Sequence, residues 1–128
     1  MKGLVSLASN KHNGSYMHPL FPQAQERIQK ASNLEEAMQK VVELLATEIA
    51  EFNWVGFYMP NPEKENELVL GPYVGEATDH THIPYGKGVC GQVALSGQTK
   101  VVQDVNEEDN YLSCSINVKS EIVAPILV

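Results

Sequence analysis

Two cysteines are the residues in this sequence most able to do chemistry. Cys90 lies in the run Gly86-Lys87-Gly88-Val89-Cys90-Gly91, where a glycine-rich loop is expected to become a helix. The positive end of a helix dipole and a neighbouring lysine both favour the thiolate, which is the reactive form. Cys114 lies 24 positions further on, in a polar loop seven residues before Glu121. Each thiol is either a nucleophile or a small buried hydrophobe, and a lone cysteine is more often the latter.

A carboxylate and two aromatic residues extend this set of candidates. Glu121 opens the otherwise apolar segment 121–128. Burial there would raise its pKa and let it donate a proton near neutral pH. Trp54 and Tyr58 are four positions apart in a strand-like segment, which places them on one face. They are either core aromatics, the commoner fate, or two walls of an apolar pocket for a small ligand with a methyl or thioether end.

His80 and His82 are candidate metal ligands. In an extended segment both imidazoles lie on one face, and with Cys90 and Cys114 they offer zinc two nitrogens and two thiolates. Neither cysteine has a close cysteine partner, so the spacing fits no recognised zinc finger. Solvated loop histidines are the favoured interpretation, and neither a metal nor a cofactor is predicted.

Two helices are expected ahead of these residues. Residues 23–30 show a polar helical pattern, and Ser32-Asn33-Leu34-Glu35 has the form of a capping box that starts a second helix. Apolar residues then recur at spacings of three and four, which predicts one apolar stripe packed on a core. The stripe consists of Leu34, Met38, Val41, Val42, Leu45 and Ile49.

Strand signals dominate the rest of the chain. The aromatic and β-branched run 54–59 predicts a strand, which a turn of prolines, asparagines and charges connects to a second strand. We expect that second strand from Glu67 to Leu70, or to Tyr73. The remaining elements are a long loop at 78–88, a short helix at 89–95, a strand at 100–105, an irregular acidic connection at 106–119 and a final strand at 121–128.

The two ends of the chain differ in character. Residues 1–22 show neither a helical nor a strand period, so we expect a flexible N-terminal arm or a partner-bound tail, followed by one domain at 23–128. The last segment is apolar on both alternating faces, which is typical of a central buried strand. No partner strand follows it in the sequence. The sheet is therefore expected to lack its C-terminal strands.

Composition excludes several classes of protein. The 128 residues suffice for about one domain, and a hydrophobic fraction of 43% argues against disorder. A formal net charge of −7 argues against nonspecific nucleic-acid binding. No run approaches the roughly 20 apolar residues that span a bilayer, and residues 1–8 lack a signal-peptide pattern. We expect a cytoplasmic protein without membrane contact, in which two cysteines are too few for a disulfide framework.

Several motifs, taken in order, resemble the GAF-domain free methionine-(R)-sulfoxide reductases. The similarity runs from about Asn53 to the end of the chain and preserves the spacings from Cys90 to Cys114 and from Cys114 to Glu121. The motifs are Trp54-Val55-Gly56-Phe57-Tyr58, Leu70-Gly71-Pro72-Tyr73, Ile83-Pro84-Tyr85-Gly86-Lys87-Gly88-Val89-Cys90-Gly91, Asp104-Val105, Cys114 and Ser120-Glu121-Ile122-Val123-Ala124-Pro125-Ile126.

The resemblance implies an α+β fold, a GAF domain with a central antiparallel sheet flanked by helices. It implies that Cys114 is the catalytic thiolate, Cys90 a second thiol with a resolving or catalytic role, and Glu121 the acid that assists sulfoxide activation. Trp54 and Tyr58 would enclose the methyl-sulfur end of the substrate.

The implied reaction is thiol-dependent reduction of free methionine-(R)-sulfoxide to methionine. The thiolate attacks the sulfoxide sulfur, an acid protonates the departing oxygen, and the cysteine becomes a sulfenic acid. A second thiol closes a disulfide that thioredoxin or a similar reductant reopens. The expected partners are therefore the small-molecule substrate and a thioredoxin-like reductant, with a homodimer as a further expectation.

The sequence departs from the family pattern at several places. Where the family usually has another cysteine, the favoured resolving partner, this chain has His80, so Cys90 or an external thiol would have to resolve the sulfenic acid. The aspartates with which the family holds the substrate amino group lie on a strand beyond residue 128, and the loop 106–113 lacks the family's Phe-Pro-Gly-His pattern. The alternative function is a noncatalytic GAF module that senses a small ligand or redox state through Cys90 and Cys114, or mainly dimerises.

Overall fold

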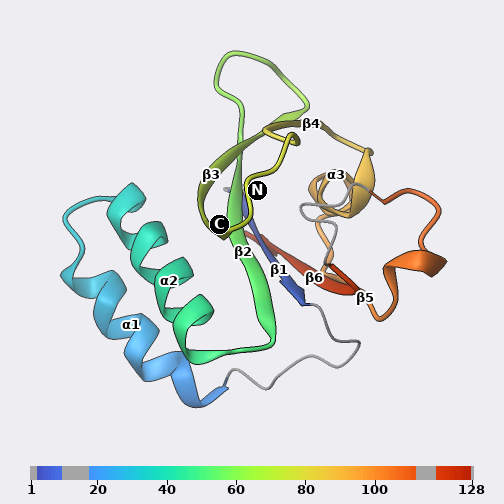
Figure 1. Ribbon diagram of the computed structural model, residues 1–128. Coiled ribbons are helices and arrows are strands. Elements are labelled where there is room, and N and C mark those ends of the chain that lie inside the picture. The colour runs from blue at the N-terminus through green and yellow to red at the C-terminus, as the bar shows by residue number, and fades with distance from the viewer. Residues whose placement is uncertain (1–2, 10–17, 112–117, 128) are drawn as a thin grey trace.

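Six strands form a single antiparallel sheet in the described part of the chain, which comprises residues 3–9, 18–111 and 118–127 of the computed structural model (Figure 1). The strand order is β4-β3-β2-β1-β6-β5. The strands are β1 (Gly3–Ser9), β2 (Phe52–Pro60), β3 (Glu67–Gly75), β4 (His82–Pro84), β5 (Lys100–Val102) and β6 (Ser120–Ile126). The helices are α1 (Phe21–Lys30), α2 (Leu34–Glu48) and α3 (Gly88–Ser96), with short 3-10 turns at His18–Leu20 and Val105–Glu107. The predicted α+β class, an antiparallel sheet flanked by helices, is confirmed.

The helices cover both faces of this sheet. Helices α1 and α2 lie together on one face, and α3 lies on the other (Figure 1). Side chains of β2 alternate between the two sides, as the strand period requires. Val55 and Phe57 pack on the α2 side, whereas Trp54 and Tyr58 belong to the core that includes α3. The predicted placement of Trp54 and Tyr58 on one face is confirmed.

The start of α2 is close to its prediction, but a different residue caps it. The Asn33 side-chain oxygen accepts a hydrogen bond from the Glu36 backbone nitrogen at 2.8 Å, and the Glu36 carboxylate accepts one from the Ser32 backbone nitrogen at 2.8 Å. This reciprocal arrangement is a capping box displaced by one residue. Glu36 therefore has the role predicted for Glu35, because both positions carry the same side chain.

The N-terminal segment is the largest difference from the sequence prediction. Residues 1–22 were expected to form a flexible arm, and for residues 3–9 this is wrong, because they form β1. Its residues pair with β2 on one side and with β6 on the other. Beyond a short apolar run, the sequence of this seven-residue strand contains no local signal. Its partners are Phe52–Pro60 and Ser120–Ile126. Long-range pairing, not local propensity, defines this strand.

Strand β6 is a central strand, as its two apolar faces predict. It lies between β1 and β5. The neighbour that does not follow it in the sequence is supplied by β1, from the opposite end of the chain.

Smaller differences concern the loops. The predicted loop at 78–88 contains the short strand β4, which pairs with the start of β3. The strand predicted at 100–105 ends at Val102 and is followed by a 3-10 turn. In the predicted acidic connection, residues 112–117 lie outside the described residues.

The position of β1 generates a stability prediction. Leu4 is fully buried in the α3-side core, so Leu4→Ala is expected to lower the free energy of unfolding by about 2–5 kcal/mol. Val5, half-buried on the opposite face, provides the matched control: Val5→Ala should lower it by a smaller amount. Urea denaturation followed by circular dichroism measures both. An unchanged unfolding midpoint in Leu4→Ala would mean that residues 3–9 do not pair in solution.

Candidate functional site

Glu121 is the centre of a buried polar cluster on the α3 side of the sheet. It lies in β6 with a 4% exposed side chain. Its Oε1 accepts a hydrogen bond from the Ser6 hydroxyl at 3.1 Å, and its Oε2 accepts one from the Tyr111 hydroxyl at 3.1 Å. The Cys90 Sγ lies 4.0 Å from Oε1. Both oxygens of the carboxyl group are thus held by groups from separate parts of the chain.

Burial dominates the electrostatics of this carboxyl group. Removal from water raises the pKa of Glu121 from 4.5 to about 7, although the hydrogen bonds from Tyr111 and Ser6 both act to lower it. A carboxyl group in this state carries a proton for part of the time at neutral pH and can donate it to a reacting atom. The predicted rise in its pKa is confirmed.

Cys90 reaches Glu121 from the first turn of α3. The predicted change from glycine-rich loop to helix is present: Gly86 and Gly88 have positive φ angles of 89° and 62°, a conformation that favours glycine. The side chain of Asn110 fixes this turn, because its oxygen accepts from the Gly88 nitrogen at 3.0 Å and its nitrogen donates to the Gly86 carbonyl at 2.8 Å. The thiol is 5% exposed and packs in the same core as Trp54 and Tyr58.

The aromatic pair is fully buried and held by backbone carbonyls. The rings of Trp54 and Tyr58 are stacked with centroids 6.3 Å apart, and Tyr73 stacks on Trp54 at 5.5 Å. Trp54 Nε1 donates to the Glu76 carbonyl at 3.0 Å, and the Tyr58 hydroxyl donates to the His80 carbonyl at 2.8 Å. These bonds fix two aromatic walls to the segment that connects β3 and β4.

His80 takes part in this arrangement through its backbone. Its carbonyl accepts from Tyr58, and its nitrogen donates to the Thr78 hydroxyl at 3.1 Å. The neighbouring His82 ring lies 3.1 Å from the Thr81 hydroxyl. Within residues 3–9, 18–111 and 118–127, no three histidine, cysteine or acidic side chains form a metal-binding group.

The structure thus brings together Glu121 with Cys90, and Trp54 with Tyr58, in adjoining parts of one core. Cys114 lies outside the described residues. Sequence reasoning missed Ser6 and Tyr111, whose hydroxyl groups donate to Glu121. Nothing local distinguishes Ser6 from other serines, whereas a lone tyrosine in the acidic connection before Glu121 was a usable signal.

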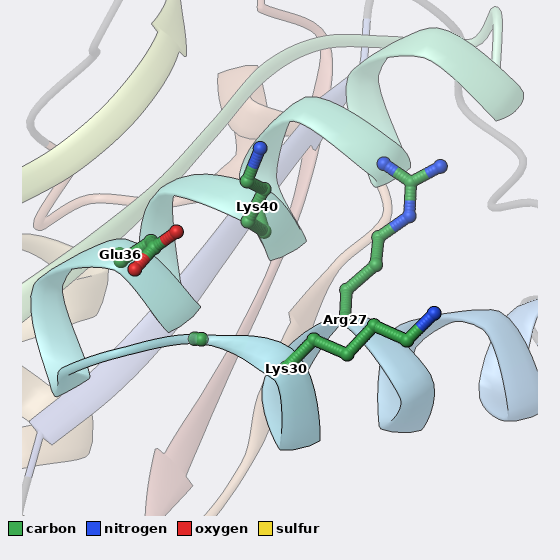
Figure 2. Close-up of a pocket in the computed structure, with 5 residues that line it drawn as sticks. Arg27, Lys30, Glu36 and Lys40 are labelled. Atoms are coloured by element: carbon green, nitrogen blue, oxygen red, sulfur yellow. The ribbon is translucent and has the colours of Figure 1, made fainter.

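Among the described residues, hollows also occur away from Glu121, at the edges of helix α2. One, of about 290 Å³, lies between α1 and α2 and is lined by Arg27, Lys30, Ala31, Glu36 and Lys40 (Figure 2). Its three cationic side chains are exposed, and Lys30 pairs with Glu26 at 2.6 Å. The other, of about 470 Å³, lies between α2 and β3. We interpret the first as a solvated surface between two helices.

The raised pKa of Glu121 makes stability depend on pH. Between about pH 4.5 and about pH 7 the folded state binds more protons at this site than the unfolded chain, so its contribution to the free energy of unfolding falls by roughly 1 kcal/mol per pH unit. The stabilising contribution of Glu121 is fully present below about pH 4.5 and is lost above about pH 7. Glu121→Gln should remove it, as measured by urea denaturation across this pH range.

Glu67→Gln is the matched control for this measurement. Glu67 is another carboxylate with little exposure, held on β3 by the Asn61 side chain at 2.9 Å and Lys64 at 3.3 Å. Its replacement should leave the decline between these pH values in place. If the free energy of unfolding declined equally in wild type and in Glu121→Gln, the raised pKa could not belong to Glu121.

Comparisons with known proteins place this geometry in context. The GAF domain family matches residues 33–128. The free methionine-R-sulfoxide reductase of Saccharomyces cerevisiae is 38% identical over 95 residues, which cover 74% of this chain and 52% of the relative. The enzyme of the same name from Escherichia coli is 36% identical over 85 residues, covering 66% and 49%. The chain thus spans about half the length of these curated relatives.

Solved structures give the same result. The free methionine-R-sulfoxide reductase of Neisseria meningitidis, in complex with its substrate, superposes with a TM-score of 0.80 at 32% identity, covering 91% of this chain and 70% of that one. The substrate complex of the Staphylococcus aureus enzyme superposes with a TM-score of 0.77 at 37% identity, covering 90% and 72%. No helix in the described ranges is long and apolar enough to cross a membrane. Because the GAF domain family matches residues 33–128, which is most of the sequence, the chain belongs to that family, and its similar relatives include free methionine-R-sulfoxide reductases.

Proposed function

We propose that this chain reduces free methionine-(R)-sulfoxide to methionine, with Cys114 as the nucleophile and Glu121 as the acid. The observation that carries the proposal is the buried Glu121 carboxyl group, whose pKa of about 7 keeps a proton available at neutral pH. Similarity to reductases of known structure in complex with substrate supports the choice of reaction.

The proposed chemistry transfers one oxygen atom. The Cys114 thiolate attacks the sulfoxide sulfur and forms a sulfur–sulfur bond, and the sulfur–oxygen bond breaks as Glu121 protonates the departing oxygen, which leaves as hydroxide. This hydroxide then attacks the Cys114 sulfur, which breaks the sulfur–sulfur bond, releases methionine and leaves a sulfenic acid on Cys114. The methionine sulfur is reduced by two electrons, and the cysteine sulfur is oxidised by two. A second thiol then displaces water and forms a disulfide, which a thioredoxin-like dithiol reduces.

The aromatic walls suit the apolar end of this substrate. Trp54 and Tyr58 stack on the side of the sheet that also carries Cys90, and their polar atoms are bound by backbone carbonyls. Because these polar atoms are occupied and both side chains are buried, contact with a methyl-sulfur group would be made by ring surface after the cluster opens, not by hydrogen bonds. We propose that these two rings bind the substrate's methyl-sulfur end.

We propose that Cys90 or an external thiol attacks the sulfenic acid and forms the disulfide. The position at which the family usually has a resolving cysteine is His80, whose described contacts are made by its backbone. Cys90 is 5% exposed, so it would reach Cys114 from within the core. A thioredoxin-like protein is the proposed reductant, and a cytoplasmic homodimer is the proposed form of the protein.

Turnover tests the proposal directly. With thioredoxin, thioredoxin reductase and NADPH, free methionine-(R)-sulfoxide should be consumed, and Cys114→Ser should abolish this consumption. Glu121→Gln should lower kcat by about 100-fold or more, because a positioned acid contributes at least that factor. In wild type, kcat/KM should fall about tenfold per pH unit above about pH 7, as Glu121 loses its proton.

Controls separate the roles of the individual residues. Glu67→Gln should retain activity, and the (S)-epimer should not be reduced. If activity survives Cys114→Ser but not Cys90→Ser, the roles of the two thiols are reversed. No NADPH oxidation by folded wild-type protein with the (R)-epimer would refute the reductase proposal.

A second candidate is a noncatalytic module that senses a small ligand or redox state. The full burial of Trp54 and Tyr58 favours it, because a closed aromatic cluster need not admit a substrate. This alternative predicts a reversible disulfide between Cys90 and Cys114, or ligand binding, without steady-state turnover. Mass spectrometry of the oxidised protein, beside the coupled assay, distinguishes the two.

A further inference from the structure

Strand β1 contributes to the Glu121 site although it lies outside the matched family region. The GAF family match covers residues 33–128, whereas β1 comprises residues 3–9. It occupies the position between β2 and β6, so Ser6 pairs with Gly56 on one side and with Val123 on the other. A segment without a counterpart in the matched region thus reaches the centre of the candidate site.

Ser6 is placed where an apolar side chain would be expected. It is fully buried, and its neighbour on the same face of β1, Leu4, belongs to the core. Its hydroxyl donates to Glu121 Oε1 at 3.1 Å. Burial of a hydroxyl group is unfavourable unless it is hydrogen-bonded, so the pairing with Glu121 accounts for a serine at this position.

The Ser6 bond fixes the orientation of the carboxyl group. Tyr111 holds Oε2 and Ser6 holds Oε1, so the two donors act on opposite oxygens. With only Tyr111 remaining, the group could rotate about its terminal torsion, which is soft. The Oε1 atom held by Ser6 is also the one that lies 4.0 Å from the Cys90 sulfur.

We propose that Ser6 is a positioning residue, which holds the Glu121 carboxyl group in the orientation needed to deliver a proton to the sulfoxide oxygen. This inference rests on the proposed reductase function and extends it to residues outside the matched family region. The N-terminal strand thereby becomes part of the site and not only of the sheet.

The expected direction of the pKa change follows from the surroundings of Glu121. In the described part of the chain, the groups that face it are Ser6 from β1, Tyr111 from the connection before β6, and Cys90 from α3. Burial raises its pKa, and within the described ranges no charged side chain contributes to the shift. The Ser6 hydrogen bond favours the carboxylate, so its loss should raise the pKa further.

A carboxyl ¹³C NMR titration of the full chain tests this directly, with Glu121→Gln used to assign the resonance. Ser6→Ala should raise the pKa of Glu121 by about one unit, and Ser6→Thr, which keeps the hydroxyl, should stay within a few tenths of wild type. In the coupled assay, Ser6→Ala should lower kcat about tenfold with little change in KM. Ser6→Ala should also move the alkaline limb of the kcat/KM pH profile to higher pH, by the same amount as the pKa of Glu121 rises.

Val5→Ala is the matched control, because it weakens the packing of β1 on the opposite face without touching the hydroxyl. It should change neither the pKa of Glu121 nor the position of the limb. If Ser6→Ala does not fold, Ser6→Cys retains the shape with a weak donor and should show the pKa rise in the NMR titration. An unchanged pKa in folded Ser6→Ala or Ser6→Cys would overturn the proposal. A pKa shift together with an inactive wild type would refute the reductase function instead.

Discussion

The pairing of β1 with both β2 and β6 holds the two halves of the sheet together. Without this strand the sheet would divide into a β4-β3-β2 unit and a β6-β5 unit, since no other strand of the described residues joins them. The same pairing sets the register of β1, so that Leu4 enters the α3-side core and Val5 the α2-side core. A slip by one residue would exchange these faces and remove the Ser6 hydroxyl from Glu121.

Glu121 shows how such a sheet tolerates a carboxyl group in its interior. Burial disfavours the charged form, while the hydroxyl groups of Ser6 and Tyr111 favour it. The outcome is a group that is neither a permanent acid nor a permanent carboxylate at neutral pH. Because uncharged donors satisfy both oxygens, the site needs no buried cation, and the penalty of a buried ion pair is avoided.

The sequence predicted those elements whose signals are local. The apolar stripe of α2 from Met38 to Ile49, the aromatic strand around Trp54 and the glycine-rich entry to α3 each follow from nearby residues, and burial of Glu121 followed from its apolar neighbours. Leu34, which the same spacing assigned to the stripe, is exposed, because it lies at the first position of the helix, beyond the edge of the core. The capping box was misplaced by one residue because Glu35 and Glu36 are adjacent and chemically identical. Strand β1 and Ser6 could not be predicted, since their pairing partners lie far away in the sequence, in β2 and β6.

The separation between these partners also affects how the chain folds. The hydrogen bond from Ser6 to Glu121 spans 115 positions, and the whole β1–β6 ladder joins segments nearly as distant. Contacts of such high sequence separation carry a large loop-closure entropy and slow the folding of a domain. The hairpin of β2 and β3 joins segments that are close in the sequence, whereas the ladder between β1 and β6 forms only once the two ends of the chain have come together. Until that step, β2 and β6 expose unpaired edges, and such edges are where chains associate with one another.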